Sequence, residues 1–346
     1  MTRRILICAT QVPFVRGGAE YLVEGLRDAL RERGHQVDVV ALPFQWHPVA
    51  RIPESALAWR MLDMSQINGQ PIDLVIATKF PSYLVRHPRK LVWLVHQHRQ
   101  AYDWYGTELS DFSGSPADRS VRDQIMRMDE RGMHECLARY TISQNVSNRL
   151  KRFNGIDSIP LYPPSRYADQ LHAGPYGDYI LSSARLDRAK RLDLLLEAMA
   201  RTRLPVRVIF AGAGPDRERL EGLAARLGLA ERACFRGFVP DNELVQLYGG
   251  ARAVYYAPID EDYGFATVEA FGAARPMITT DDSGGVLEFV RHEQNGLIVR
   301  PDPAQIALAL DALSADAALA ERLGRAGQPL VRSISWDRVT TALLSH

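Results

Sequence analysis

The chain runs twice through an alternation of short apolar segments and amphipathic stretches, and this repetition constrains its fold more than any other feature. The first run has an apolar segment at 5–9, a glycine pair, and apolar residues at helical spacing over 19–33. The second run begins with an apolar segment at 179–183. Strands that alternate with helices form parallel sheets covered on both faces. The sequence therefore predicts an α/β fold with two such sheets.

Further segments continue both runs. In the first, strands are predicted at 37–42, 74–77 and 91–95. In the second, strands are predicted at 206–211, 233–235, 253–257, 277–280 and 297–299. Helices at 192–201, 216–227 and 264–274 are predicted to connect them. The two runs are similar in size, as expected for two Rossmann-like α/β/α domains.

A segment rich in proline and glycine separates the two runs. It reads "SIPLYPPSRYADQLHAGPYGDY", which is typical of a connection between domains. The predicted organisation is an N-terminal domain at 1–163, a linker at 164–178, a C-terminal domain at 179–330 and a final helical segment at 331–346. Ligands of such sheets bind beyond the carboxyl ends of the strands. Two sheets facing a cleft between domains would present their strand-to-helix loops to it.

Composition excludes several classes of protein. The formal net charge of the 346 residues is +1, which does not favour a dedicated nucleic-acid binder. The three cysteines are far apart, so a disulfide scaffold or a zinc site is not expected, and a cytoplasmic location fits. The apolar run near the N-terminus is too short for a signal peptide, and no run is long enough to span a membrane.

Two cations follow the first strand of the second run. The segment "SSARLDRAKRLDLLLEAM" places Arg185 and Lys190 between a strand and a helix. An arginine can grip phosphate oxygens with its two-pronged guanidinium, and a lysine adds a mobile positive charge, so the pair suits a diphosphate. A basic turn in solvent remains the alternative, because Arg188 and Arg191 are basic as well.

The segment "EDYGFATVEAFGAARPMIT" carries two acids on either side of a glycine. A helix is predicted to begin near Gly264, and its first N–H groups can bind an anion. Glu269 lies one turn further on, and its side chain leans back toward the same end of the helix. Glu261 lies in the preceding loop. A sugar nucleotide would satisfy both acids and the amides. A capping acid and an exposed helical glutamate are the alternative.

This segment resembles the Glu-x7-Glu signature of the retaining glycosyltransferases of family 4, which have the GT-B fold. Other segments resemble the same family in the same order, among them "GGAEYLVEGLRDALRERGHQVDVV", "ARLDRAK", "FAGAGP" and "GGVLEFVRHEQNGLIV". The resemblance implies a hexosyltransferase that moves a sugar from a UDP- or GDP-sugar to an acceptor hydroxyl with retention. It also implies a role in bacterial-type cell-surface polysaccharide or glycolipid synthesis.

The resemblance also assigns roles. Arg185 and Lys190 would neutralise the departing diphosphate, and Glu261 would bind hydroxyls of the transferred sugar. Glu269 would bind the ribose. The donor-binding residues that it implies are Gly17, Gly18, Gly212, Gly237, Phe238, Val239, Tyr263, Gly264, Phe265, Ala266 and Glu269.

A histidine after a strand of the first domain completes the implied site. The segment "LVWLVHQHRQAYDWYG" offers His96 and His98. His96 directly follows the strand and is therefore preferred as the catalytic histidine near the donor sugar. A structural role for this histidine is the alternative.

Asp260 and Asp262 form a D-x-D pair that could bind Mg²⁺ or Mn²⁺. The cations Arg185 and Lys190 already supply positive charge for the diphosphate, so we expect no metal and no cofactor beyond the nucleotide sugar.

The acceptor is expected to be a saccharide or a lipid-linked saccharide that binds the first domain. Lys79, Arg86, Arg89 and Lys90 could meet a lipid-linked diphosphate or an anionic membrane, which would allow peripheral contact at its inner face. Buried aromatics and a solvated basic turn are the alternative.

Other functions fit parts of this pattern. A dinucleotide-dependent oxidoreductase needs G-x-G-x-x-G, and "AGAGPDRERL" lacks the third glycine. A GT-B sugar-nucleotide epimerase or sugar-phosphate transferase, and a non-catalytic nucleotide- or carbohydrate-binding protein, remain open from the residues alone.

Overall fold

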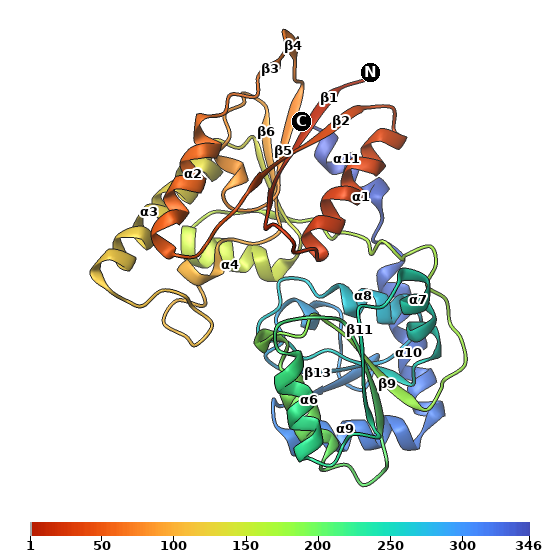
Figure 1. Cartoon of the computed structure of the whole chain (residues 1–346). Coiled ribbons are helices and arrows are strands. Elements are labelled where there is room, and N and C mark those ends of the chain that lie inside the picture. The colour runs from red at the N-terminus through yellow and green to blue at the C-terminus, as the bar shows by residue number, and fades with distance from the viewer. Residues whose placement is uncertain (1) are drawn as a thin grey trace. The chain divides into compact units, whose positions relative to one another are not determined.

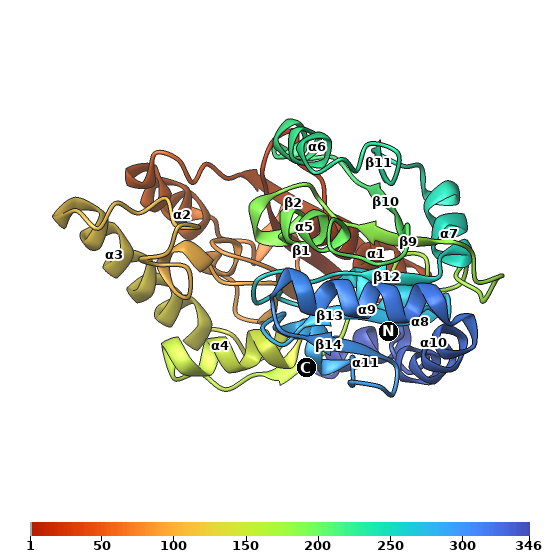
Figure 2. The ribbon, with the colours of Figure 1, turned by 90° about the horizontal axis from the view of Figure 1, so that it is seen from below.

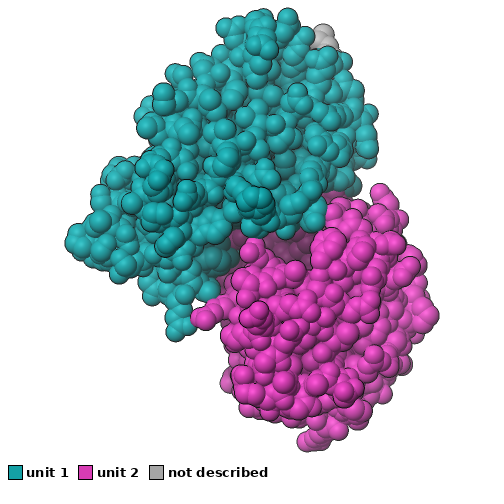
Figure 3. Space-filling model, in the orientation of Figure 1, with its two compact units in different colours: residues 1–163, 335–346 teal, residues 164–334 magenta. Residues whose placement is uncertain are grey.

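The chain folds into two compact units, each built around a parallel sheet. The computed structural model describes residues 2–346. Unit 1 comprises Met1–Pro163 and Ser335–His346, and unit 2 comprises Pro164–Ile334 (Figure 3). The proline-rich segment 164–178 thus lies within unit 2, and the chain passes between the units twice.

Unit 1 contains a six-stranded sheet in which all neighbouring strands are parallel. The strand order is β2-β1-β5-β6-β7-β8, and Figure 1 labels the first four of these strands. The strands are β1 (Arg4–Gln11), β2 (Gln36–Pro43), β5 (Leu74–Ala77), β6 (Lys90–Leu94), β7 (Ala138–Thr141) and β8 (Ile159–Pro160). The central strands β5 and β6 are buried along their whole length, as expected where helices cover both faces.

Helices flank this sheet. They are α1 (Gly18–Glu32), α2 (Ile52–Met61), α3 (Pro116–His134) and α4 (Gln144–Asn154), and a small antiparallel hairpin is formed by β3 (Gln66–Ile67) and β4 (Gln70–Pro71). Helix α1 buries Leu22, Leu26 and Leu30, which are spaced to lie on one face. Helices α2 and α3 lie side by side (Figures 1 and 2).

The last helix, α11 (Trp336–Leu344), belongs to unit 1. Its Trp336 ring lies 6.2 Å from the Trp93 ring of β6. Gly25 of α1 makes room for Trp336, because a Cβ there would come within 2.3 Å of the indole. Arg3 donates hydrogen bonds to the carbonyl oxygens of Leu344 and His346, each at 3.0 Å. These contacts hold residues 336–346 against β6, α1 and the residue that precedes β1.

Unit 2 contains a second parallel sheet with the order β11-β10-β9-β12-β13-β14. Its strands are β9 (Tyr179–Ser183), β10 (Arg207–Ala211), β11 (Ala233–Gly237), β12 (Ala253–Tyr255), β13 (Met277–Thr280) and β14 (Gly296–Val299). Its helices are α5 (Leu192–Met199), α6 (Arg217–Arg226), α7 (Asp241–Gly250), α8 (Phe265–Gly272), α9 (Pro303–Ala315) and α10 (Ala317–Val331). Helices α8 and α10 pack against each other (Figure 2).

Both sheets contain a point where the strand order reverses. In unit 2 the first strand of the unit, β9, lies between β10 and β12, and in unit 1 β1 lies between β2 and β5. The helices after such neighbouring strands cover opposite faces, so a crevice opens at their carboxyl ends, and ligands of open α/β sheets bind there. The topology thus singles out the loops after β9 and β12 in unit 2, and those after β1 and β5 in unit 1.

The prediction of an α/β fold with two parallel sheets is confirmed. The predicted strands agree with β1, β2, β5, β6 and β9 to β14 within about two residues at most ends. In unit 1, strands β7 and β8 and helices α2, α3 and α4 were not predicted. Strand β7 has only four residues, and the exposed face of α3 is dense in charged side chains, which masks the apolar period.

Candidate functional site

The loop after β12 is fixed by backbone hydrogen bonds to two neighbouring loops. The Ile259 N–H donates to the Ala189 carbonyl at 2.9 Å, and the Glu261 N–H donates to the Ser283 carbonyl at 3.2 Å. The Gly285 N–H donates in turn to the Glu261 carbonyl at 2.8 Å. Glu261 is therefore held in place at the switch point of unit 2.

Arg191, one of the four basic residues of the predicted phosphate loop, holds these loops together. Its guanidinium donates to the carbonyls of Ala257 at 2.9 Å and Pro258 at 3.0 Å, and it pairs with the Asp282 carboxylate at 2.7 Å. It therefore joins the loops that follow β9, β12 and β13. This role is structural, so Arg191 is not part of a solvated basic turn.

Lys190 and Glu261 meet in an ion pair, as the proximity of their two loops allows. Lys190 Nζ also lies 3.1 Å from the Tyr256 hydroxyl, which donates to Glu261 Oε2 at 2.8 Å. Burial opposes the charge of Lys190, but Glu261, Tyr256 and Asp187 together outweigh it and leave the pKa of Lys190 above its ordinary value. Burial and the Glu261 charge also raise the pKa of Tyr256. At neutral pH Lys190 is therefore an ammonium and Tyr256 a neutral phenol.

Arg185 lies in the same loop, but it is much less restrained. Its side chain is 51% exposed, and its Nε lies 3.9 Å from Asp187 Oδ2, at the outer limit of an ion pair. Burial raises the pKa of Asp187, although the charges of Lys190 and Arg185 oppose this rise. The guanidinium of Arg185 is thus available to an anion that enters this crevice.

Gly264 begins α8 with a backbone that other residues adopt only with strain. Its φ is 83°, and a Cβ there would lie 2.9 Å from Val286 Cγ2 and 3.2 Å from Tyr256 Cε1. The Thr267 N–H donates to the Gly264 carbonyl at 2.9 Å. The N–H groups of Phe265 and Ala266 belong to the first turn, where no intrahelical acceptor is available, and the positive end of the helix dipole adds to them.

Glu269 is buried within unit 2. Its Oε1 accepts a hydrogen bond from the Ser165 hydroxyl at 2.9 Å, and its Oε2 accepts one from the Tyr248 hydroxyl at 2.8 Å. Burial raises the pKa of Glu269, and these two hydroxyls act against the rise. Each carboxylate oxygen has a second lone pair, so Glu269 can accept further hydrogen bonds from ligand hydroxyls.

The loops after β10 and β11 meet directly. The Gly212 N–H donates to the Gly237 carbonyl at 2.8 Å. A Cβ on Gly212 would lie 1.9 Å from the Ala184 carbonyl oxygen, so only glycine fits there. Phe238 is 74% exposed, whereas Val239 is buried.

Tyr263 is buried in unit 2, and its ring packs edge-on against Phe265 at 5.1 Å and Phe289 at 5.6 Å. The structure therefore gives the Tyr263 ring a place in the hydrophobic packing beside α8. Among the residues predicted to bind the donor in unit 2, Gly212, Gly237 and Gly264 to Ala266 all lie close after the carboxyl ends of β10, β11 and β12.

The predicted glycine loop of unit 1 leads directly into α1, and a glutamate of that helix accepts a hydrogen bond from the loop. Gly17 is the N-terminal cap of α1, with an extended backbone that any residue can adopt. Its N–H donates to Glu20 Oε2 at 2.8 Å, and Glu20 Oε1 pairs with Lys79 Nζ at 3.2 Å. Gly18 is the first residue of the helix. Glu20 and Lys79 were not predicted to interact, because they are far apart in the sequence and meet only across the switch point.

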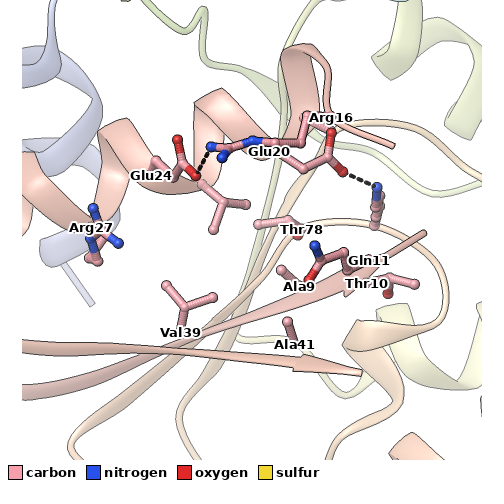
Figure 4. A pocket seen from close by; sticks show the side chains of 13 residues that line it. Ala9, Thr10, Gln11, Arg16, Glu20, Glu24, Arg27, Val39, Ala41 and Thr78 are labelled. Carbon is pink, nitrogen blue, oxygen red and sulfur yellow. Dashed lines mark hydrogen bonds and ion pairs between the residues drawn. The ribbon is translucent and has the colours of Figure 1, made fainter. Parts of the chain in front are cut away.

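A pocket of about 220 Å³ lies beside these residues (Figure 4). It is lined by Ala9, Thr10, Gln11, Arg16, Ala19, Glu20, Val23, Glu24, Arg27, Val39, Ala41, Thr78 and Lys79. These residues come from β1, β2, α1 and the loops that follow β1 and β5. Thr10 is only 2% exposed, and its hydroxyl has no hydrogen-bond partner within residues 2–346. The sequence did not predict this pocket.

In the segment after β6, His96 is followed by three buried residues. Gln97, His98 and Arg99 are buried, whereas His96 is partly exposed, and its Nδ1 lies 2.7 Å from the Gln97 carbonyl oxygen. His98 lies among the rings of Phe44, Phe80 and Phe112. Burial lowers the pKa of His98 to about 4. His98 is therefore a neutral packing residue, which leaves His96 as the candidate catalytic histidine.

A buried hydrogen-bond network continues from Gln97. Its side-chain amide donates to the Asn154 oxygen, and the Asn154 amide donates to the Tyr102 hydroxyl at 3.3 Å. The Tyr102 hydroxyl donates to Asp129 at 2.6 Å, and Asp129 also accepts from Tyr83 at 2.7 Å. Complete burial raises the pKa of Asp129 to about 7 against the effect of both phenols. This network links α3 and α4 to the segment that carries His96.

Residues 2–346 contain no group of three or more His, Cys, Asp or Glu side chains placed to hold a metal ion. None of the helices in this part of the chain is long and apolar enough to cross a membrane.

Comparison with protein families gives a match over part of the chain. Residues 170–329, which lie within unit 2, match the family model described as "Glycosyl transferases group 1".

Two curated proteins illustrate the range of relatives. The chain is 26% identical over 378 aligned positions to an uncharacterized glycosyltransferase of Methanocaldococcus jannaschii, covering 94% of this chain and 93% of that protein. It is 31% identical over 175 positions to a D-inositol 3-phosphate glycosyltransferase of Streptomyces bingchenggensis, covering 47% of this chain and only 38% of that enzyme. The chain therefore matches less than half the length of the Streptomyces enzyme.

Solved structures match both units. A sucrose-phosphate synthase from Thermosynechococcus elongatus has a TM-score of 0.78 at 20% identity, covering 98% of this chain and 97% of the synthase. The Anabaena protein HepE, solved in complex with UDP and glucose, has a TM-score of 0.71 at 16% identity, covering 98% of both chains. The comparisons show the GT-B fold and, with the family model, support a glycosyltransferase.

Proposed function

We propose that the chain is a retaining glycosyltransferase of family 4 that transfers a hexose-type sugar from a UDP- or GDP-sugar to an acceptor hydroxyl. The observation that carries this proposal is the arrangement at the switch point of unit 2. There, Arg185 and Lys190 follow β9, and Glu261 and the first turn of α8 follow β12. Cations, helix amides and carboxylates at one crevice suit a diphosphate that has hydroxylated groups at both ends.

In this proposal, Arg185, Lys190 and the amides after Gly264 bind the diphosphate. Negative charge grows on the diphosphate as the sugar–oxygen bond breaks, so fixed positive groups stabilise the transition state more than the bound donor. Lys190 is paired with Glu261 before the donor binds. A donor phosphate can form an ion pair with Lys190 in place of Glu261. The Glu261 carboxylate can then accept hydrogen bonds from the hydroxyls of the transferred sugar.

Glu269 accepts the ribose hydroxyls. Ser165 and Tyr248 fix the direction of its carboxylate, and the remaining lone pairs face the ligand. The loops around Gly212 and Gly237–Val239 contact the nucleotide, mostly through backbone. His96, partly exposed on its anchored segment, lies near the donor sugar and assists transfer.

The likeness to HepE in complex with UDP and glucose supports a nucleotide-sugar donor. The acceptor is a saccharide or a lipid-linked saccharide, and the product serves cell-surface polysaccharide or glycolipid synthesis. Transfer at the inner face of a membrane requires peripheral contact only. No metal takes part, so EDTA should leave turnover unchanged. Loss of turnover in EDTA and recovery with Mn²⁺ would assign Asp260 and Asp262 to a metal instead.

A thermal-shift panel of UDP-, GDP- and ADP-sugars is the first test, since a ligand that binds the native state raises its stability. A labelled form of the donor that binds is then incubated with candidate acceptors. Free nucleotide together with an unchanged sugar on the acceptor supports transfer. Conversion of the donor sugar to its epimer would identify an epimerase, and binding without transfer or donor hydrolysis would identify a non-catalytic binding protein.

The role of the cations is tested by Arg185→Ala, with Arg188→Ala in the same loop as the matched control. Both side chains are exposed, so neither change should disturb folding. Loss of one group that stabilises the transition state typically costs about 100-fold or more in kcat. We expect that loss for Arg185→Ala alone, with the donor KM changed far less. Equal kcat values in the two variants would remove Arg185 from the mechanism.

A further inference from the structure

Tyr256 lies where three parts of the unit 2 crevice meet. It directly follows β12, and its N–H donates to the Ile278 carbonyl at 3.0 Å, which continues the pairing with β13. Tyr256 is only 7% exposed, and its hydroxyl lies 3.1 Å from Lys190 Nζ and 2.8 Å from Glu261 Oε2. A Cβ on Gly264 would come within 3.2 Å of its ring. Tyr256 therefore contacts the loop after β9, the loop after β12 and the start of α8.

The three polar groups form a closed cycle of hydrogen bonds. The Lys190 ammonium donates to the Tyr256 hydroxyl and to Glu261 Oε2, and the hydroxyl donates to the same Oε2. A phenol has one O–H to donate and lone pairs to accept, so it serves both charged groups at once. Acceptance from a cation polarises the hydroxyl and strengthens the bond that it donates. Lys190 and Glu261 are thus joined both directly and through the phenol.

In the proposed function, donor binding breaks the direct contact, because a phosphate oxygen replaces Glu261 on Lys190. Both side chains are largely buried, with 19% of the Lys190 side chain and 17% of the Glu261 side chain exposed. Separating opposite charges costs more there than in water, since little solvent is present to screen them. The Tyr256 hydroxyl can stay in contact with both groups while they separate. It therefore contributes more in the donor complex, where it replaces the direct contact, than in the free protein.

We propose that Tyr256 is a positioning residue for donor binding, whose hydroxyl bridges Lys190 and Glu261 once a phosphate has displaced the carboxylate from the ammonium. The inference rests on the proposed function and deepens it, because it states how one ion pair can be divided between the diphosphate and the transferred sugar. The bridge is present in the bound donor and in the transition state alike. It therefore strengthens donor binding and leaves the barrier to transfer unchanged.

The neighbouring tyrosine provides a matched control. Tyr255 is completely buried in the core of unit 2, and its hydroxyl has no hydrogen-bond partner within residues 2–346. Tyr255→Phe and Tyr256→Phe each remove one hydroxyl from adjacent positions and keep the ring. The contact of the Tyr256 ring with the start of α8 therefore survives the change. Only Tyr256→Phe removes hydrogen bonds to charged groups.

Titration calorimetry with UDP and GDP measures the effect on the nucleotide that binds the wild type. We expect Tyr256→Phe to raise its dissociation constant about tenfold, the lower end for loss of a hydrogen bond to a charged group. Tyr255→Phe should leave this constant unchanged. In turnover assays of Tyr256→Phe, the donor KM should rise by the same factor while kcat stays nearly constant. Unchanged affinity in Tyr256→Phe, equal losses in the two variants, or a loss confined to kcat would overturn the proposal.

A second background tests whether the phenol acts through Glu261. Glu261→Gln keeps the shape of the side chain and removes its charge, so separation from Lys190 no longer divides two opposite charges. In this background we expect Tyr256→Phe to change the nucleotide dissociation constant far less than in the wild type, which is the mark of two coupled residues. The same tenfold increase in both backgrounds would contradict the bridge, because the hydroxyl would then act on the nucleotide independently of Glu261.

The inference and the proposed function fail in different ways. Nucleotide binding and transfer by the wild type, with no difference between Tyr256→Phe and Tyr255→Phe, would reject the bridge and keep the transferase. Nucleotide binding that weakens in Tyr256→Phe as expected, without transfer or donor hydrolysis by the wild type, would keep the bridge and reject the function. Absence of UDP and GDP binding to the wild type would reject both.

Discussion

At the scale of single residues, the crevice of unit 2 is organised by side chains that are already paired within the protein. Lys190 is paired with Glu261, and Glu269 is held by Ser165 and Tyr248. Arg185 differs, because it is half exposed. The paired groups keep their orientation without a ligand, which lowers the entropy that binding would otherwise lose. Arg185 is the cation of this loop whose side chain is least restrained.

We expect Glu269→Gln to weaken nucleotide binding by about 10- to 100-fold, the range for loss of charged hydrogen bonds. The change keeps the size of the side chain but removes the negative charge and one acceptor. Titration calorimetry with UDP and GDP provides the measurement. Ser165→Ala is the matched control, because it removes one support of the carboxylate and keeps the carboxylate itself. Nucleotide affinity unchanged in Glu269→Gln would eliminate the ribose role.

Gly264→Ala is expected to cost both stability and turnover. A residue with a side chain pays about 1–2 kcal/mol for a left-handed backbone, and the new Cβ would also contact Val286 at 2.9 Å. Gly155→Ala is the matched control, because its φ is also positive at 68° and its Cβ would meet nothing within 4 Å. Denaturation and kcat measurements should show a larger loss for Gly264→Ala. Equal losses in both would mean that the contact at Gly264 is relieved at no cost.

At the scale of elements, short strands determine where candidate site residues lie, because those residues are in the loops that follow the carboxyl ends of the strands. Strand β12 has only three residues, yet the loop that follows it carries Glu261 and leads into α8. In unit 1, strand β6 is followed by a segment in which Gln97, His98 and Arg99 are all buried. Their burial leaves His96 as the partly exposed residue at the start of this segment. The buried residues Gln97, His98 and Arg99 thus determine the position of the His96 side chain.

The stability of the protein should depend on pH through Asp129, which belongs to the buried hydrogen-bond network that begins at Gln97. Its pKa is raised from 3.8 to about 7 by burial. Between these values the unfolded state has lost the proton that the folded state keeps, so the stability contributed by this proton falls as pH rises toward 7. Asp129→Asn removes the titration, so the wild type should lose stability relative to this variant between about pH 4 and 7. Urea denaturation of both proteins across this range measures the difference, and parallel curves would show that Asp129 does not titrate there.

Most strands and several candidate site residues could be predicted from the sequence. The elements and contacts that could not be predicted depend on residues that are distant in the sequence. Hydrophobic periodicity located ten of the twelve strands of the two parallel sheets, because each is a local signal. The glycine before α8 and the two acids around it were also local. The partners of Glu269 could not be predicted, because Ser165 lies 104 residues away and meets it only through packing. The pocket was missed for the same reason: Thr10 and Lys79 come together only when β1 and β5 pair.

At the scale of the whole molecule, unit 2 is inserted into unit 1. The chain leaves unit 1 after Pro163 and returns to it at Ser335. Helix α11 then packs against α1, with Trp336 between Gly25 and Trp93. Unit 1 is therefore assembled from two segments that are distant in the sequence, whereas unit 2 is continuous.

Trp336→Ala should destabilise unit 1 selectively, by about 3 kcal/mol, the low end for truncation of a packed aromatic residue. Calorimetric unfolding with and without UDP separates the units, because a nucleotide bound to unit 2 raises only the transition of that unit. We expect the transition that does not respond to UDP to move to lower temperature in the variant. A shift of the UDP-sensitive transition instead would show that α11 supports unit 2. Leu308→Ala, on the exposed face of α9, serves as the control.

The return of the chain to unit 1 has a consequence for synthesis on the ribosome. All residues of unit 2 emerge before 335–346 do, so this unit can complete its sheet while the chain is still attached. Unit 1, although its strands are made first, lacks the Trp336 contact until the final helix has emerged. During that interval the surface of α1 beside Gly25 stays uncovered, so unit 1 gains its full packing only after unit 2 has emerged.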